Sequence, residues 1–147
     1  MQRMGSRSAT ELLQLPVRLH GIRLGQPVDL LLDSREWRAL GFVVLCGDDA
    51  CRFLVFAAGD VGEEAIDVPS AFLLLEDVDF YRDRSRSLRG LLGRPVVDAA
   101  PEVGELRDLL LRADGGVDAL VVAGDDGVRE VEPTGLAAAG AEHVPTA

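Results

Sequence analysis

Apolar and polar residues alternate through most of the chain in runs of about five or six residues, a pattern typical of half-buried β-strands. Polar turns rich in Gly, Asp and Ser separate the runs. Strands are predicted at 17–22, 28–33, 37–45, 51–56, 65–68, 71–81, 93–98, 105–112, 117–123 and 128–133. Ser8 and Glu11 fit a capping box, which predicts a short helical turn that ends before Pro16. The pattern indicates an all-β protein built as a small barrel or sandwich, and not a β-α-β fold.

The two halves of the chain repeat one motif at an offset of 79 residues. Gly25, Asp29 and the leucines 30–32 recur as Gly104, Asp108 and the leucines 109–111. A Gly-Asp-Asp turn follows at 47–49 and again at 124–126, an offset of 77, so the second copy is expected to be two residues shorter in the turn after its triplet. The outer leucines of each triplet should face one core and the middle leucine the opposite side of the strand. The duplication predicts that Leu30 and Leu109, and likewise Leu32 and Leu111, occupy like environments.

These residues resemble the PRC-barrel family, which includes a domain of a ribosome-maturation factor and the cytoplasmic domain of the photosynthetic reaction centre H subunit. Its pattern is a Gly-x-x-Val strand, a Gly-x-Val-x-Asp-hydrophobic strand, a turn, a run of small and apolar residues, and hydrophobic-Pro-x-x-hydrophobic. The second half matches it at Gly93, Val96, Gly104, Leu106, Asp108, Leu109, Ala119, Val121 and Pro133, and the first at Gly21, Gly25, Val28, Asp29, Leu30, Leu40, Val43, Val68, Pro69 and Ala71. The match covers about residues 15–136. It departs from the pattern at Pro27 and in the final strand of the second copy.

The resemblance implies two tandem PRC-barrel-like small β-barrels, used for binding and assembly and without catalytic residues. The corresponding division of the chain is a flexible N-terminus (1–14), a first repeat (15–81), a linker (82–90), a second repeat (91–136) and a flexible tail (137–147).

The composition narrows the classes of function. The 147 residues carry a net charge of −10, from 25 acidic residues against 15 arginines and no lysine, so lysine Schiff-base and P-loop chemistry are excluded. An acidic chain repels phosphate backbones, which disfavours nucleic-acid binding over a broad surface. Its apolar runs are shorter than the roughly 20 residues of a membrane helix, and no secretory segment follows Met1. We therefore expect a cytoplasmic protein without a membrane span.

Candidate catalytic and metal-binding groups are sparse. Cys46 and Cys51 flank the first Gly-Asp-Asp turn, where a disulfide or metal clip is conceivable but buried free cysteines are favoured. The acidic pairs 48–49 and 125–126 favour ordinary turns over a cation site. No Gly-x-Ser-x-Gly motif occurs, and His20, the one histidine in a predicted strand, has no evident partner, so serine nucleophiles lack a base. We expect no enzyme activity, no cofactor and no bound metal.

Two clusters are candidates for binding. The predicted linker holds Arg82, Arg84, Arg86 and Arg89, which would grip RNA or an acidic partner, although a solvated linker is the favoured interpretation. Trp37, beside Arg35 and Arg38, is a candidate hot spot for a protein partner, whereas Phe42 and Phe80 are expected in the core. The sequence therefore predicts a non-catalytic protein-binding or assembly adaptor, with a ribosome- or RNA-associated factor as the alternative. A homodimer is compatible with either, and we expect no measurable RNA affinity at physiological salt.

Overall fold

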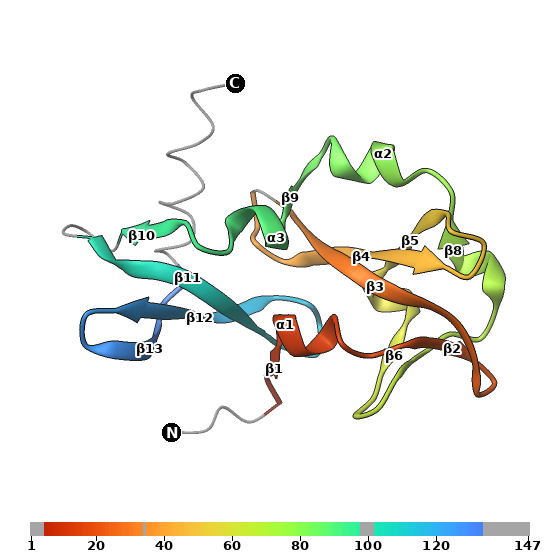
Figure 1. The fold of residues 1–147 in the computed structure, drawn as a ribbon, viewed down its shortest axis with the longest axis horizontal. Helices are drawn as coiled ribbons and strands as arrows, with labels where there is room; N and C mark the ends of the chain where they lie inside the picture. The colour runs from red at the N-terminus through yellow and green to blue at the C-terminus, as the bar shows by residue number, and fades with distance from the viewer. Residues whose placement is uncertain (1–4, 34, 98–101, 134–147) are drawn as a thin grey trace.

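The computed structural model describes residues 5–33, 35–97 and 102–133 and consists mostly of strands in two sheets (Figure 1). The larger, strongly curled sheet contains β2 (Val17–Leu19), β3 (Ile22–Asp33), β4 (Ala39–Cys46), β5 (Cys51–Val55), β6 (Asp60–Val61), β7 (Ile66–Asp67), β8 (Leu74–Leu75) and β9 (Ser85–Ser87). The second sheet contains β1 (Arg7–Ser8), β10 (Pro95–Val97), β11 (Glu102–Leu111), β12 (Val117–Gly124) and β13 (Gly127–Val131). The helices are α1 (Ala9–Leu12), η1 (Phe56–Ala58), η2 (Ala71–Leu73), α2 (Val78–Arg82) and α3 (Leu88–Leu91). The all-β class is confirmed, whereas the two tandem PRC-type barrels stay a prediction.

The duplication extends to the register of the strands. β3 pairs with β4 as β11 pairs with β12, and each long strand shifts register at two equivalent points, between Pro27/Asp29 and Leu31/Leu32 in β3 and between Leu106/Asp108 and Leu110/Leu111 in β11. The offset is 79 from β3 to β11, 78 from β4 to β12 and 77 from β5 to β13. The second copy is therefore one residue shorter in each of two turns, and not two residues shorter in one turn.

The segment that opens each repeat packs on the sheet of the other repeat. β1 pairs with β11, so the N-terminal arm of the first copy joins the second sheet, and β9 pairs with β3, so the arm of the second copy joins the first sheet. Each arm continues into a short helix, α1 after Ser8 and α3 after Ser87, and each serine accepts a hydrogen bond from the main chain of its helix. Ser8 and Ser87 are themselves 79 residues apart.

This exchange corrects two predicted boundaries. Residues 7–12 of the supposed flexible N-terminus form β1 and α1, and residues 85–90 of the supposed linker form β9 and most of α3. Both segments are ordered because their apolar side chains are buried in the core, including Ala9, Leu12 and Leu88. The predicted tail, 137–147, lies outside the described residues.

The repeated aspartates join each arm to the opposite sheet. Asp108 accepts hydrogen bonds from the Ser8 hydroxyl, from the Thr10 main-chain N–H and hydroxyl (both 3.0 Å) and from the Leu109 N–H (2.8 Å). Asp29 accepts the equivalent bonds from the Ser87 hydroxyl, the Arg89 N–H (3.1 Å) and the Leu30 N–H (2.8 Å). A carboxylate beside a register shift satisfies several donors at once, which explains why both copies place Asp at this position.

The two copies meet at equivalent turns, related by an approximate two-fold axis. The Ala39 N–H donates to the Gly115 carbonyl (2.7 Å), and the Val117 N–H donates to the Trp37 carbonyl (3.2 Å). At an offset of 78, Trp37 corresponds to Gly115 and Ala39 to Val117. The two-fold axis therefore relates these two hydrogen bonds to each other.

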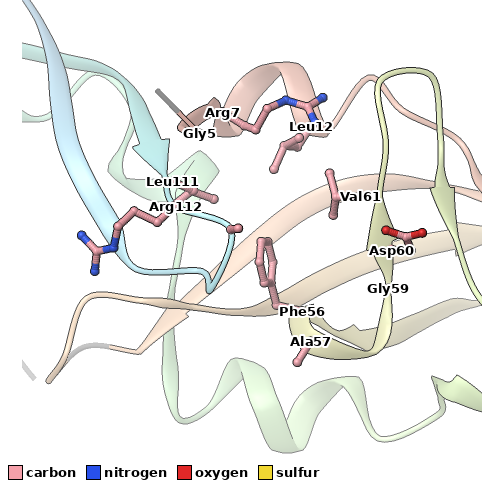
Figure 2. A pocket seen from close by; sticks show the side chains of 11 residues that line it. Gly5, Arg7, Leu12, Phe56, Ala57, Gly59, Asp60, Val61, Leu111 and Arg112 are labelled. Carbon is pink, nitrogen blue, oxygen red and sulfur yellow. The ribbon is translucent and has the colours of Figure 1, made fainter. Parts of the chain in front are cut away.

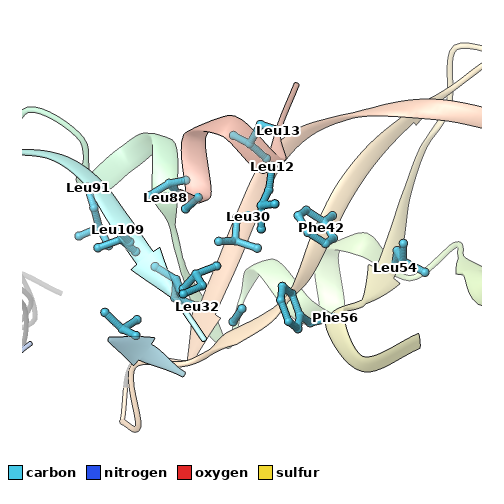
Figure 3. Packing of buried hydrophobic residues seen from close by; sticks show 14 of the residues in the cluster. Leu12, Leu13, Leu30, Leu32, Phe42, Leu54, Phe56, Leu88, Leu91 and Leu109 are labelled. Atoms are coloured by element: carbon cyan, nitrogen blue, oxygen red, sulfur yellow. The ribbon is translucent and has the colours of Figure 1, made fainter. Parts of the chain in front are cut away.

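One core lies between the two sheets and serves both copies (Figure 3). Leu30 and Leu109 are fully buried in it, and Leu32 and Leu111 are buried beside them, which confirms the predicted environments of the outer leucines. Leu31, the middle leucine of the first triplet, points into a separate small cluster under α2. The middle-leucine prediction is confirmed there as well.

The predicted strand at 71–81 is wrong except at residues 74–75. The segment forms η2, the two-residue strand β8 and the helix α2. The Ser70 hydroxyl accepts from the Phe72 N–H (3.1 Å), which starts η2, and Val78 and Tyr81 have the three-residue spacing of a helix face that covers Leu31. Phe80, which lies between them, is 50% exposed, contrary to its predicted place in the core.

Candidate binding surface

The arginines selected from the sequence come from two segments that meet in space. Four of these arginines lie in the stretch of chain that runs through α2, β9 and α3 (Figure 1): Arg82, Arg84 (between α2 and β9), Arg86 and Arg89. Ser85 of β9 pairs with Asp33 at the end of β3, two residues before Arg35. The turn that carries Arg35 therefore lies beside the segment that carries the other arginines. We call Arg35, Arg82, Arg84 and Arg89 the arginine surface.

Arg84 is positioned by a neighbouring aromatic ring. Its guanidinium lies 3.8 Å from the centre of the Phe80 ring and donates to the Phe80 carbonyl at 2.8 Å. Tyr81 stacks on the buried Phe53 with ring centres 3.9 Å apart, which fixes α2 to the sheet. The pair formed by Phe80 and Arg84 thus presents an apolar ring and a cation together at an exposed position.

Within the described residues, the guanidinium groups of the arginine surface have no carboxylate at ion-pair distance. Arg89 donates through Nε to the Val28 carbonyl, and Arg84 donates to a carbonyl as well, so both are held by main-chain acceptors. Among the described residues, the guanidinium groups of Arg35, Arg82, Arg84 and Arg89 form no ion pair. Arg86 differs, because it is partly buried on β9 and has an interaction of its own.

Several arginines outside the arginine surface lie beside acidic side chains. Arg52 forms a bidentate pair with Asp48 (2.8 and 3.0 Å), and Arg112 lies 3.6 Å from Asp114. Arg38, which the sequence grouped with Trp37, donates to the Asp114 carbonyl (3.0 Å) and lies 3.9 Å from the Glu36 carboxylate. Arg38 therefore holds the turns at the two-fold axis and is not part of the arginine surface.

Trp37 belongs to the turn and not to a strand, since β4 begins at Ala39. It is half-buried against the main core, with φ of +52°, a left-handed conformation that is rare for a bulky residue. The equivalent residue in the second copy is Gly115, with φ of +91°. Trp37 lines a shallow groove of about 260 Å³ with Glu36, Arg38, Arg112, Gly116, Val117 and Pro133. Trp37 thus packs against the core while it lines this groove, and its role as a hot spot for a protein partner stays a prediction.

The cysteines and the acidic turn form no joint site. Cys46 is buried as predicted, but Cys51, the first residue of β5, is exposed, and both thiols are free. Within the described part of the chain, no group of three or more His, Cys, Asp and Glu side chains is arranged to hold a metal ion. His20 lies exposed in the β2–β3 turn and not in the predicted strand.

Asp48 provides a pH-dependent test of the first Gly-Asp-Asp turn. Hydrogen bonds from Arg52, and then from the Ala50 N–H, lower the pKa of Asp48 from 3.8 to about 2. Because the folded pKa is depressed, the pair stabilises the turn above about pH 4 and this contribution is lost as the pH falls through 2. In a carbon-13 carboxyl titration, Asp48 should show a midpoint of about 2, rising toward 3.8 in Arg52→Gln. An unchanged midpoint in that variant would contradict the pairing.

Two residues of the surface were misjudged from sequence alone. Phe80 was expected in the core, although its four-residue spacing to Arg84 is the spacing at which a ring and a cation meet on a helix. Arg89 was expected in a solvated linker, although its position two residues after Ser87 matches that of Thr10 after Ser8 at the 79-residue offset. A comparison of the two arms would have predicted that Arg89 lies beside Asp29, as Thr10 lies beside Asp108.

No helix in the described residues is long and apolar enough to cross a membrane. No family model matches the chain, and no curated protein is significantly similar to it.

Proposed function

We propose that this chain is a non-catalytic protein-binding or assembly module, as the resemblance to PRC-barrel proteins implies, and that it binds an acidic segment of a protein partner on the arginine surface. The observation that supports the proposal is the set of four guanidinium groups without carboxylate partners in a chain of net charge −10. Arginines held by main-chain carbonyls keep donor groups available, and planar guanidinium groups suit bidentate recognition of carboxylates.

The shape of the partner segment follows from α2. Phe80 is half exposed beside Arg84, so it offers an apolar contact within a cationic surface. A peptide that alternates acidic and aromatic residues would place rings on Phe80 and carboxylates on the neighbouring arginines. We expect a short linear motif to be enough to make these contacts.

RNA is the alternative ligand for the same cations. Removing the four arginines of the surface from the sum leaves a net charge of −14 on the rest of the chain (−10 − 4). A phosphate backbone that extends beyond the arginine surface would meet this negative charge, whereas a short acidic peptide would not reach far beyond it. The charge distribution therefore favours the peptide.

The test compares two variants of equal charge. One replaces Arg35, Arg82, Arg84 and Arg89 by alanine, and the control replaces Arg18, Arg23, Arg107 and Arg129, which lie on other strands. Binding of a fluorescein-labelled peptide of alternating glutamate and phenylalanine is measured by anisotropy over a range of salt concentrations. We expect the first variant to bind at least about tenfold more weakly than the wild type, because charge-assisted contacts are lost, and the control to bind nearly as well as the wild type.

The outcomes separate the two ligands. A glutamine version of the peptide should not bind, and short oligouridine should show no measurable affinity at physiological salt. Equal weakening in both variants would show a charge effect that is not local, and would overturn the assignment of the surface. Oligouridine binding that falls steeply with salt and is lost only in the first variant would establish the RNA alternative instead.

A further inference from the structure

A cavity of about 450 Å³ lies where the N-terminal arm of the first repeat faces the rest of that repeat (Figure 2). Leu12 of α1, Phe56 of η1, Val61 of β6 and Leu111 of β11 supply its apolar walls. Leu12, Leu111 and Phe56 are buried, so the cavity extends from the main core toward the surface. Its volume falls in the range of sites for small organic ligands.

Arg7 is the charged group of this cavity that no acidic side chain offsets. It lies partly buried on β1, and Figure 2 shows its side chain along the same rim as Leu12. Across the described residues, its guanidinium has no hydrogen-bond or ion-pair partner. Arg112, at the opposite rim, turns away toward Asp118 (3.7 Å), and Asp60 is exposed at the outer rim. A half-buried cation without an anion is costly, which indicates a place for a negatively charged group.

The walls of the cavity come in part from segments that have an equivalent in the other repeat. At the 79-residue offset Arg7 corresponds to Arg86, Leu12 to Leu91 and Leu111 to Leu32. The remaining wall comes from η1 and β6, which follow β5 in the first copy. Arg86, on the other side of the axis, makes an interaction within the chain. Arg7 and Arg86 are equivalent in the repeat but differ in their interactions within the described part of the chain.

We infer that this cavity binds an amphiphilic monocarboxylate, with the carboxylate on Arg7 and the aliphatic or aromatic body against Leu12, Phe56 and Leu111. The walls accept an apolar body without hydrogen-bond requirements, and the single uncompensated guanidinium matches one carboxylate in bidentate geometry. The site is separate from the arginine surface and does not depend on a protein partner.

The experiment titrates octanoate and octanol, which share a chain and differ in charge, into the full chain while methyl NMR signals are followed. Octanoate should shift the methyl resonances of Leu12, Val61 and Leu111 and raise the melting temperature, because it binds the folded state. Octanol should bind at least about tenfold more weakly, since it cannot pair with the guanidinium.

Two variants make the test specific. Arg7→Met keeps an unbranched side chain of similar length and should lose octanoate binding by about tenfold or more, while the ligand-free protein melts at the same or a higher temperature because an unpaired, half-buried charge is gone. Arg23→Met, a surface arginine on β3, should bind octanoate as the wild type does. Equal binding of octanoate and octanol, shifts at other methyl groups, undiminished binding to Arg7→Met, or no octanoate binding would each overturn the inference.

Discussion

Replacing Asp108 by alanine should lower the free energy of unfolding by about 2–4 kcal/mol and the melting temperature by about 5–15 °C. The carboxylate accepts four hydrogen bonds, three of them from Ser8 and Thr10 of the exchanged arm. Without it, these donors lose their partners at a part-buried position, and the arm that carries Ala9 and Leu12 into the core is no longer held to β11.

Denaturant melts and amide hydrogen exchange check this expectation together. The Thr10 N–H donates to Asp108, so its exchange should become much faster in the variant even where the protein remains folded. Asp125→Ala is the matched control, since Asp125 is exposed in the β12–β13 turn, and it should leave both measurements unchanged. A variant with normal stability and a protected Thr10 amide would show that Asp108 does not hold the arm.

Asp29→Ala should give the same kind of loss at the other arm, with faster exchange at the Arg89 N–H. Asp29 accepts three hydrogen bonds where Asp108 accepts four, so the loss should be the smaller of the two. Comparable behaviour at both aspartates is what an exchange related by a two-fold axis requires.

The offset of 79 residues was enough to predict the common environments of Leu30 and Leu109. The prediction also used the period-two alternation of a strand, because residues at positions i and i+2 face the same side. The exchange of the arms was not predicted, because a repeat in the sequence says which segments are alike but not on which copy each one packs. The sequence did contain part of this information. Ser8 and Ser87 stand at the same offset, which shows that the repeated unit begins at the arm.

The helix α2, which covers one face of the first sheet, was also not predicted from the sequence. In the first copy Val28, Leu40 and Phe53 pack near or in the small cluster under α2. Their equivalents in the second copy are Arg107, Asp118 and Glu130. Comparing the copies position by position therefore predicts that this face is covered once and solvated once, even though neither copy alone reveals that 78–82 is helical.

The candidate sites were harder to predict for a physical reason. The arginines were visible in the sequence, but whether each is neutralised depends on tertiary neighbours, as the contrast between Arg38 and Arg84 shows. Arg7 gave no signal at all, because its significance comes from Phe56 and Val61, which lie about fifty residues away in the chain.

Leu109→Ala should destabilise the entire molecule by about 2–5 kcal/mol, because it opens a cavity in a core that both repeats share. Trp37, the one tryptophan, lies in the first repeat, while far-UV circular dichroism reports strands of both. If the core is common, urea unfolding of the variant followed by Trp37 fluorescence and by circular dichroism should give coincident transitions, both shifted to lower urea. Leu110→Ala, at a half-buried position on the other side of the same strand, should cost less than about 1 kcal/mol. A Trp37 transition that stays at the wild-type midpoint while the dichroism transition splits in two would mean that each repeat folds around a core of its own, as independent tandem barrels would.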